Sequence, residues 1–197
     1  MLTITRIIAS PKITPSSSQI AEKIKSLSLT GILPAAPCVS PEPAYPPVPI
    51  AKSDWDSLFA GLDAGRYDIV CNGVEVTDER AKTYDFTEPY GYIHTALAVR
   101  KDNDEITSFE DLKGKTTANS LASTYMELAE SYGATVQGID TLEETIQLLT
   151  AGRIDATLNA DVSFYDYMNV HPDADFKLVA QTAEASHVAI PVLKSED

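Results

Sequence analysis

Residues 72–90, NGVEVTDERAKTYDFTEPY, carry the strongest local signals in this chain. An apolar segment at 67–72 leads into them and predicts a buried strand that ends at a turn containing Gly73. Thr77 then offers a helix N-cap, and the two acidic residues that follow it would occupy the first turn, where the helix dipole favours negative charge. The stretch therefore predicts a strand, a tight turn and a short helix.

Arg80 stands in the first turn of that helix, where its charge meets the positive end of the dipole. This position is unfavourable for helix stability, and an anion held by the arginine gives one physical reason to tolerate it. A guanidinium suits a carboxylate because it donates two parallel, charge-assisted hydrogen bonds. The alternative is an exposed arginine that pairs with Glu79, Asp85 or Glu88, and such a surface pair contributes little to stability. The spacing alone leaves both interpretations open.

The composition describes a foldable and strongly acidic chain. Its 197 residues, 44% of them hydrophobic, can bury a core in one domain or in two small lobes. The net charge of −14 argues against nucleic acid as a partner, and no apolar run is long enough to span a bilayer. Cys38 and Cys71 are too few for a disulfide framework. No ligands accompany His94 at metal spacing, so we expect neither a metal site nor a cofactor.

The first fifty residues differ from the rest of the chain. Residues 1–51 carry a net charge of +2, whereas residues 52–197 carry −16. Seven of the twelve prolines lie between positions 34 and 49. Because proline removes a hydrogen-bond donor and fixes φ, this segment is predicted to be extended or disordered rather than helical. The apolar part of residues 1–9 is too short for a clear signal peptide.

Strand and helix signals alternate over the rest of the chain. This alternation predicts an α/β fold with right-handed crossovers and a parallel sheet. Ligands of such sheets bind beyond the carboxyl ends of the strands, at helix N-termini. Three loops have that position, at 73–80, 120–124 and 159–161. The strands expected after residue 90 are 92–99, Thr116–Asn119, 134–139, 154–158, 176–180 and 187–192.

Several motifs of this part of the chain resemble one family. In order they are WDSLFAGLDAGRYDIVCNGVEVTDERAKTYDFTEPY, LAVRKD, ITSFEDLKGKT, LTAGRIDATLNAD and HVAIPV. Together they resemble the polar amino-acid solute-binding proteins of ABC importers, family 3, which have the type II periplasmic-binding-protein fold. The resemblance implies an α/β protein with two lobes, each a mostly parallel sheet flanked by helices. It assigns residues 52–91 plus 187–197 to an incomplete lobe 1 and residues 92–186 to lobe 2. It leaves residues 1–51 as an atypical proline-rich segment.

The resemblance also implies a ligand site. Arg80 matches the arginine that grips the ligand α-carboxylate, and Ser123 and Thr124 match the helix start that completes the carboxylate site. A helix N-terminus together with an arginine is a physically reasonable anion site. The residues expected to bind the ligand are Arg80, Gly73, Glu75, Ser120, Ser123, Thr124, Asn159 and Asp161.

The partner of the ligand ammonium group is less defined. Gly73 and Glu75 match positions that meet the α-amino group or the side chain of the ligand. Many relatives carry an aspartate one place before Asp161, where this chain has Ala160. Either Asp161 or Glu75 therefore takes that role. A purely structural alternative also stands, in which Asp161 and Ser123 are helix N-caps.

By resemblance, the chain is the substrate-binding component of an ABC importer and not an enzyme. It would bind a polar amino acid such as cystine or glutamine in the cleft between its lobes and present it to a membrane permease. Full-length relatives are periplasmic or extracellular, either lipid-anchored or secreted. Two alternatives remain open: a cyclohexadienyl-dehydratase-like enzyme that uses Glu75 as its acid or base, and a truncated fragment without ligand binding. Departures from the family pattern at both ends lead us to expect a truncated gene product.

Overall fold

The structure is a computed structural model that describes residues 4–5, 50–51 and 54–194. The chain forms two compact units, and each is taken by itself. Unit 1 contains residues 60–88 and the described residues from 189 onward, and unit 2 contains residues 54–59 and 89–188. Two short strands, β1 (Ile4–Thr5) and β2 (Ile50–Ala51), pair antiparallel. The rest of the proline-rich segment lies outside the described residues.

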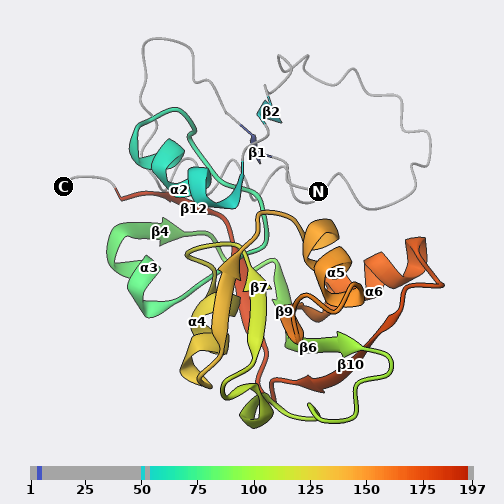
Figure 1. Cartoon of the computed structure of the whole chain (residues 1–197). Coiled ribbons are helices and arrows are strands. Elements are labelled where there is room, and N and C mark those ends of the chain that lie inside the picture. The colour runs from blue at the N-terminus through green and yellow to red at the C-terminus, as the bar shows by residue number, and fades with distance from the viewer. Residues whose placement is uncertain (1–3, 6–49, 52–53, 195–197) are drawn as a thin grey trace, which may run out of the picture. The chain divides into compact units, whose positions relative to one another are not determined.

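A five-stranded mixed sheet forms the centre of unit 2 (Figure 1). Strand β6 is antiparallel to both of its neighbours, β10 and β9, whereas β7 is parallel to β9 and β8. Four strands thus run in one direction and β6 alone runs in the other. The expectation of a mostly parallel sheet is therefore wrong for two of the four pairings, because an antiparallel neighbour needs no crossover helix. In spatial order the strands are β10 (Phe176–Gln181), β6 (Thr95–Arg100), β9 (Ala156–Ala160), β7 (Thr116–Asn119) and β8 (Thr135–Gly138).

Strand β6 is buried on both faces of this sheet. Its alternate residues belong to two hydrophobic clusters, Ala96 and Ala98 to one and Leu97 and Val99 to the other. All four side chains are fully buried. Because successive residues of a strand point to opposite sides, the two clusters lie on opposite faces of the sheet.

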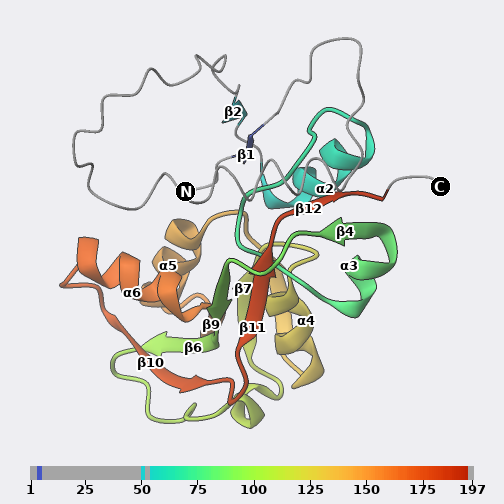
Figure 2. The same ribbon diagram turned by 180° about the vertical axis from the view of Figure 1, so that it is seen from behind.

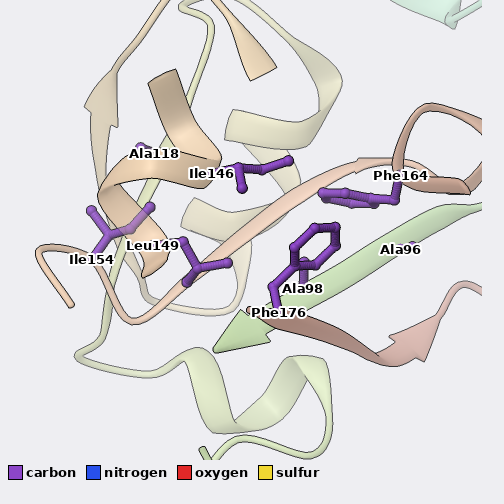
Figure 3. Packing of buried hydrophobic residues seen from close by; sticks show 8 residues of the cluster. All are labelled: Ala96, Ala98, Ala118, Ile146, Leu149, Ile154, Phe164 and Phe176. Carbon is purple, nitrogen blue, oxygen red and sulfur yellow. The ribbon is translucent and has the colours of Figure 1, made fainter. Parts of the chain in front are cut away.

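Each cluster fixes a different set of helices against the sheet. The cluster that contains Ala96 also includes residues of α5 and α6, and Figure 3 shows it from close by. Within it the ring centroids of Phe164 and Phe176 lie 5.8 Å apart. The cluster that contains Leu97 includes residues of α4 and of a short 3-10 helix, η1. The bounds of these helices are η1 (Phe109–Leu112), α4 (Thr124–Ser131), α5 (Leu142–Thr150) and α6 (Asp161–Val170).

The strands expected at residues 92–99 and 187–192 are each broken in the middle. Residues 92–99 divide at His94 into β5 (Gly91–Ile93) and β6, because the His94 N–H donates to Asp161 Oδ1 at 3.3 Å instead of to a strand neighbour. Residues 187–192 divide into β11 (Ser186–Ala189), seen from behind in Figure 2, and β12 (Pro191–Leu193). At this second break the Ile190 N–H donates to the Thr87 hydroxyl at 3.2 Å. Within unit 2, β11 pairs antiparallel with β5.

Unit 1 is built around short elements and a small apolar cluster. Its last strand, β12, pairs antiparallel with β4 (Tyr84–Phe86). Helix α2 (Trp55–Asp63) is divided between the two units and buries Leu58 and Leu62 completely. None of the helices in the described part of the chain is long and apolar enough to cross a membrane.

The strand expected at residues 67–72 is absent from the structure. Ile69 and Val70 are buried as predicted, but the segment joins β12 through a backbone hydrogen bond from Val70 to Pro191 and not through a strand ladder. Strand pairing begins later, at β3 (Val74–Glu75). The apolar composition therefore predicted the burial of this segment correctly. It could not predict strand pairing, because pairing depends on partner residues that the local sequence does not specify.

Tyr84 links two elements of unit 1. Its side chain is buried, and its hydroxyl donates to Asp63 Oδ1 at 2.8 Å. Burial is the main cause that raises the pKa of Tyr84 to about 12, and the hydrogen bond to the Asp63 carboxylate adds to it. The phenol therefore holds its proton more tightly in the folded chain than in the unfolded chain.

This shift predicts a loss of stability at alkaline pH. Because the folded-state pKa lies above the ordinary value near 10, the contribution of Tyr84 is fully present below about pH 10 and disappears as the pH rises toward about 12. Tyr84→Phe should weaken this alkaline decline in the free energy of unfolding, measured by urea denaturation from pH 8 to 12. Tyr165→Phe, on an exposed tyrosine of unit 2, is the control and should leave the decline unchanged. Identical curves for native chain and Tyr84→Phe would contradict the shift.

Candidate functional site

In unit 1 the expected site residues lie on β3, on α3 (Asp78–Thr83) and in the turn before β3. Thr77 is the N-cap of α3, as predicted, and its hydroxyl accepts a hydrogen bond from the Arg80 N–H at 3.2 Å. The half-buried Arg80 side chain donates from Nη1 to the Glu75 carbonyl oxygen at 3.0 Å. The structure thus brings Arg80 and Glu75 together within one unit. Glu79, one of the partners weighed for Arg80, pairs with Lys82 on the surface.

Glu75 is the most unusual charged residue of unit 1. Its side chain is only 6% exposed, and Oε1 has no hydrogen-bond partner among the described residues. A buried carboxylate oxygen without a donor costs free energy, and a cation or a hydrogen-bond donor that enters the site would remove that cost. Gly73 lies two residues earlier, is exposed and has a φ of +60°, a conformation that side chains with a Cβ rarely adopt.

In unit 2 the first group of expected residues surrounds the N-terminus of α4. Ser123 is the N-cap of this helix, and its hydroxyl accepts from the Met126 N–H at 3.2 Å and donates to the Ser120 carbonyl at 2.7 Å. Thr124 is the first helical residue and is half-buried. The first backbone N–H groups of a helix lack partners within it and favour an anion. The N-cap role and an anion-binding role are therefore compatible at Ser123.

The second group follows strand β9. Asp161 is the first residue of α6 and not its N-cap, which is Ala160, so the cap alternative is wrong for Asp161. Its Oδ1 accepts from the Val162 N–H at 2.8 Å as well as from His94. The Asn159 side-chain oxygen accepts from the Ala160 N–H at 2.8 Å. Both side chains thus already support the backbone around the start of α6.

The two groups of unit 2 stand at the ends of adjacent strands. Strands β7 and β9 are parallel neighbours, so their carboxyl ends and the segments that follow them lie at the same edge of the sheet. Ser120 directly follows β7, and Asn159 is the second-to-last residue of β9. Among the described residues no group of three or more His, Cys, Asp or Glu side chains is placed to hold a metal ion.

Comparison with known proteins places these residues in a family. The family described as "Bacterial extracellular solute-binding proteins, family 3" matches residues 46–138. This chain belongs to that family. A probable amino-acid ABC transporter-binding protein of Haemophilus influenzae is 33% identical over 150 residues, which are 76% of this chain and 58% of that protein. The L-cystine-binding protein TcyA of Bacillus subtilis is 37% identical over 137 residues, 70% of this chain and 51% of that protein.

Solved structures agree with the family. An ancestral arginine-binding protein bound to arginine matches with a TM-score of 0.68 and 34% identity, over 74% of this chain and 66% of that chain. The α/β architecture of this family 3 solute-binding protein is thus shared with a ligand-bound relative over the matched part. The chain spans about half the length of the curated relatives that it matches, with 58% and 51% of the two named above.

The loop before α4 contains a feature that the motifs of this family 3 protein did not reveal. Ala122 has a φ of +53° and is the only residue other than glycine with a positive φ in the described part of the chain. The left-handed conformation is sterically unfavourable for any residue with a Cβ. No periodicity or composition signal marks such a residue, because alanine is common in helices and loops alike.

Ala122→Gly should raise the free energy of unfolding by roughly 0.5–1 kcal/mol. The left-handed conformation costs an L-residue about 1–2 kcal/mol, and glycine avoids this cost. Part of the gain is offset because glycine has more conformational entropy in the unfolded chain. Ala129→Gly, within α4, is the control and should lower it by about 1 kcal/mol or more, because glycine disfavours the helix and also removes a buried methyl group. Urea denaturation followed by circular dichroism measures both. A loss of stability in Ala122→Gly equal to that of the control would show that the backbone is not left-handed at this position.

Proposed function

We propose that this chain is the amino-acid-binding component of an ABC importer. Its ligand is a free polar amino acid. Three kinds of relative support this assignment, since their names describe an amino-acid ABC transporter-binding protein, a cystine-binding protein and an arginine-binding protein. The proposal extends to the whole type II binding-protein architecture, to a permease as the membrane partner, and to a periplasmic or extracellular location.

The observation that carries the proposal is the proximity of two groups of opposite charge in unit 1. A guanidinium at Arg80 and a buried carboxylate at Glu75 stand five residues apart and are joined by a hydrogen bond to the Glu75 backbone. A free amino acid is a zwitterion, with a carboxylate and an ammonium group on the same carbon atom. Arg80 complements the carboxylate through bidentate hydrogen bonds, and Glu75 complements the ammonium.

In unit 2 the start of α4 offers donors of the kind that a carboxylate accepts from. Ser123 and Thr124 stand at that helix start, where backbone N–H groups point away from the helix. Asp161 has one oxygen engaged with the backbone of His94 and Val162, which favours Glu75 over Asp161 as the principal partner of the ammonium. The mechanism is binding without covalent chemistry, in which the charged contacts gain strength as water leaves the site.

A thermal-shift screen against the twenty amino acids and cystine tests the assignment. A ligand that binds only the folded chain stabilises it by about 2.7 kcal/mol at a hundred times its dissociation constant. We expect a clear rise of the melting temperature with one polar amino acid or a small group of them, with cystine, glutamine and arginine as the first to test. A cooperative melt that none of the ligands shifts would overturn the proposed function while leaving the fold intact.

Arg80→Ala should weaken binding of the ligand found in that screen by about 2–5 kcal/mol, because the ligand carboxylate loses its charged partner. This corresponds to a dissociation constant roughly 30- to 5,000-fold higher. Isothermal titration calorimetry measures it directly. Arg66→Ala is the matched control, since Arg66 is an exposed arginine of the same unit. Equal affinities for the Arg80 and Arg66 variants would remove Arg80 from the site.

A further inference from the structure

The carboxyl ends of β7 and β9 form a switch point in the sheet of unit 2. The two strands are parallel neighbours, aligned at Thr117 and Ala156. The helix that follows β7, α4, packs in the cluster containing Leu97, whereas the helix that follows β9, α6, packs in the cluster containing Ala96. The chain therefore leaves these adjacent strands toward opposite faces of the sheet, which is the arrangement at which open α/β sheets bind ligands.

Two side-chain hydrogen bonds join β7 and β9 beyond the aligned pair. Asn119 Nδ2 donates to the Leu158 carbonyl oxygen at 2.5 Å, and Thr157 Oγ1 donates to the Ala118 carbonyl oxygen at 2.8 Å. The orientation of the Asn119 amide follows from chemistry, because a carbonyl oxygen only accepts and the amide nitrogen must face it. Asn119 is also bonded to the residue that follows β8, since its carbonyl oxygen accepts from the Ile139 N–H at 3.0 Å.

Asn119 is not a residue that stability alone would favour. Its side chain is 4% exposed, and Oδ1 has no hydrogen-bond partner within the part of the chain that the structure describes. Thr117 stands two residues earlier on the same face of β7, is fully buried, and also has an unpaired oxygen by the same criterion. A buried acceptor or hydroxyl without a partner costs free energy, and an apolar residue of similar size avoids that cost.

The two residues differ in what their side chains connect. Asn119 is the last residue of β7 and directly precedes Ser120, and its partner Leu158 directly precedes Asn159. No hydrogen bond from the Thr117 hydroxyl to β9 is present within the described residues. One side-chain bond thus joins the starts of the two segments that carry the expected site residues of unit 2, residues 120–124 and 159–161.

We infer that Asn119 is a positioning residue of the amino-acid site. Its Nδ2 bond to Leu158 sets the spacing between the carboxylate-binding start of α4 and the segment at 159–161. Its amide nitrogen is already bonded to the Leu158 carbonyl oxygen, so it acts through the residues that follow it. This role rests on the proposed function, and it accounts for a buried amide that leaves one oxygen unpaired.

The test compares Asn119→Leu with Thr117→Val in the full chain. Both variants remove an unpaired buried oxygen, but only Asn119→Leu also removes the hydrogen bond from Asn119 to the Leu158 carbonyl oxygen. Hydrogen exchange of the ligand-free chain is the first measurement. We expect Asn119→Leu to speed exchange of backbone amides in residues 120–124 and 159–161 about tenfold, because both segments lose their shared anchor. Thr117→Val should leave exchange in these segments unchanged.

Calorimetry and thermal melting are the second pair of measurements. We expect Asn119→Leu to raise the dissociation constant of the amino-acid ligand about tenfold. Its melting temperature should stay within about 4 °C of the native value, because the unpaired Asn119 oxygen is removed while the Leu158 carbonyl oxygen loses its side-chain donor. Thr117→Val should keep the native dissociation constant. A structural role alone would instead lower the melting temperature and leave the affinity of the folded chain unchanged.

The outcomes separate this inference from the proposed function. If Asn119→Leu matches Thr117→Val in both exchange and affinity, the positioning role is wrong. If Asn119→Leu does not give a cooperative melt, Asn119→Ala removes the same amide with less bulk and must show the same faster exchange. A third outcome is that the unsubstituted chain binds no amino acid although both segments exchange faster in Asn119→Leu. The structural link between β7 and β9 is then confirmed, and the proposed function is wrong.

Discussion

Burial of strand β6 on both faces is the constraint on which unit 2 depends. Its apolar residues alternate between two clusters, so one six-residue strand fixes α5 and α6 on one side of the sheet and α4 on the other. Because β9 and β7 run parallel to each other, their carboxyl ends lie at a common edge. The candidate ligand-binding segments of unit 2 follow from that arrangement, since residues 120–124 come directly after β7 and residues 159–161 include the end of β9 and the start of α6. Packing far from the site therefore decides which side chains can act together.

Local chemistry made much of the secondary structure predictable. Thr77 caps α3 as predicted, with its hydroxyl accepting from the Arg80 N–H, and the limits of β7 agree with the prediction. These features depend on residues within four positions of one another, so the sequence states them directly. The direction of β6 and the break at His94 depend instead on partners far along the chain, such as Asp161 and Thr182. No local pattern encodes a partner of that kind, and both were missed.

In the candidate site, too, some features follow from the local sequence and others depend on residues far along the chain. Arg80, Glu75 and Ser123 belong to motifs that could be read in the sequence, and the structure adds that Arg80 bonds to the Glu75 backbone and that Ser123 caps α4. Their contacts with a ligand, like the division of the chain into a partial lobe 1 and a lobe 2, stay predictions. Asn119 and Ala122 could not be found in advance, because one depends on the neighbouring strand and the other on a backbone angle. Composition does not mark Asn119 either, because β7 reads TTAN and three of its four residues are polar.

Unpaired oxygens in the two units have different physical consequences for a binding protein. Glu75 in unit 1 and Asn119 in unit 2 are both almost fully buried, and each has one oxygen without a partner among the described residues. A carboxylate of this kind interacts strongly with a cation, so an ammonium group that reaches Glu75 removes its cost and couples binding to stability. In the proposed roles, Asn119 acts instead through its bond to Leu158, which exists before a ligand arrives. Glu75 would then change the energy of binding directly, whereas Asn119 would maintain the geometry of two neighbouring segments.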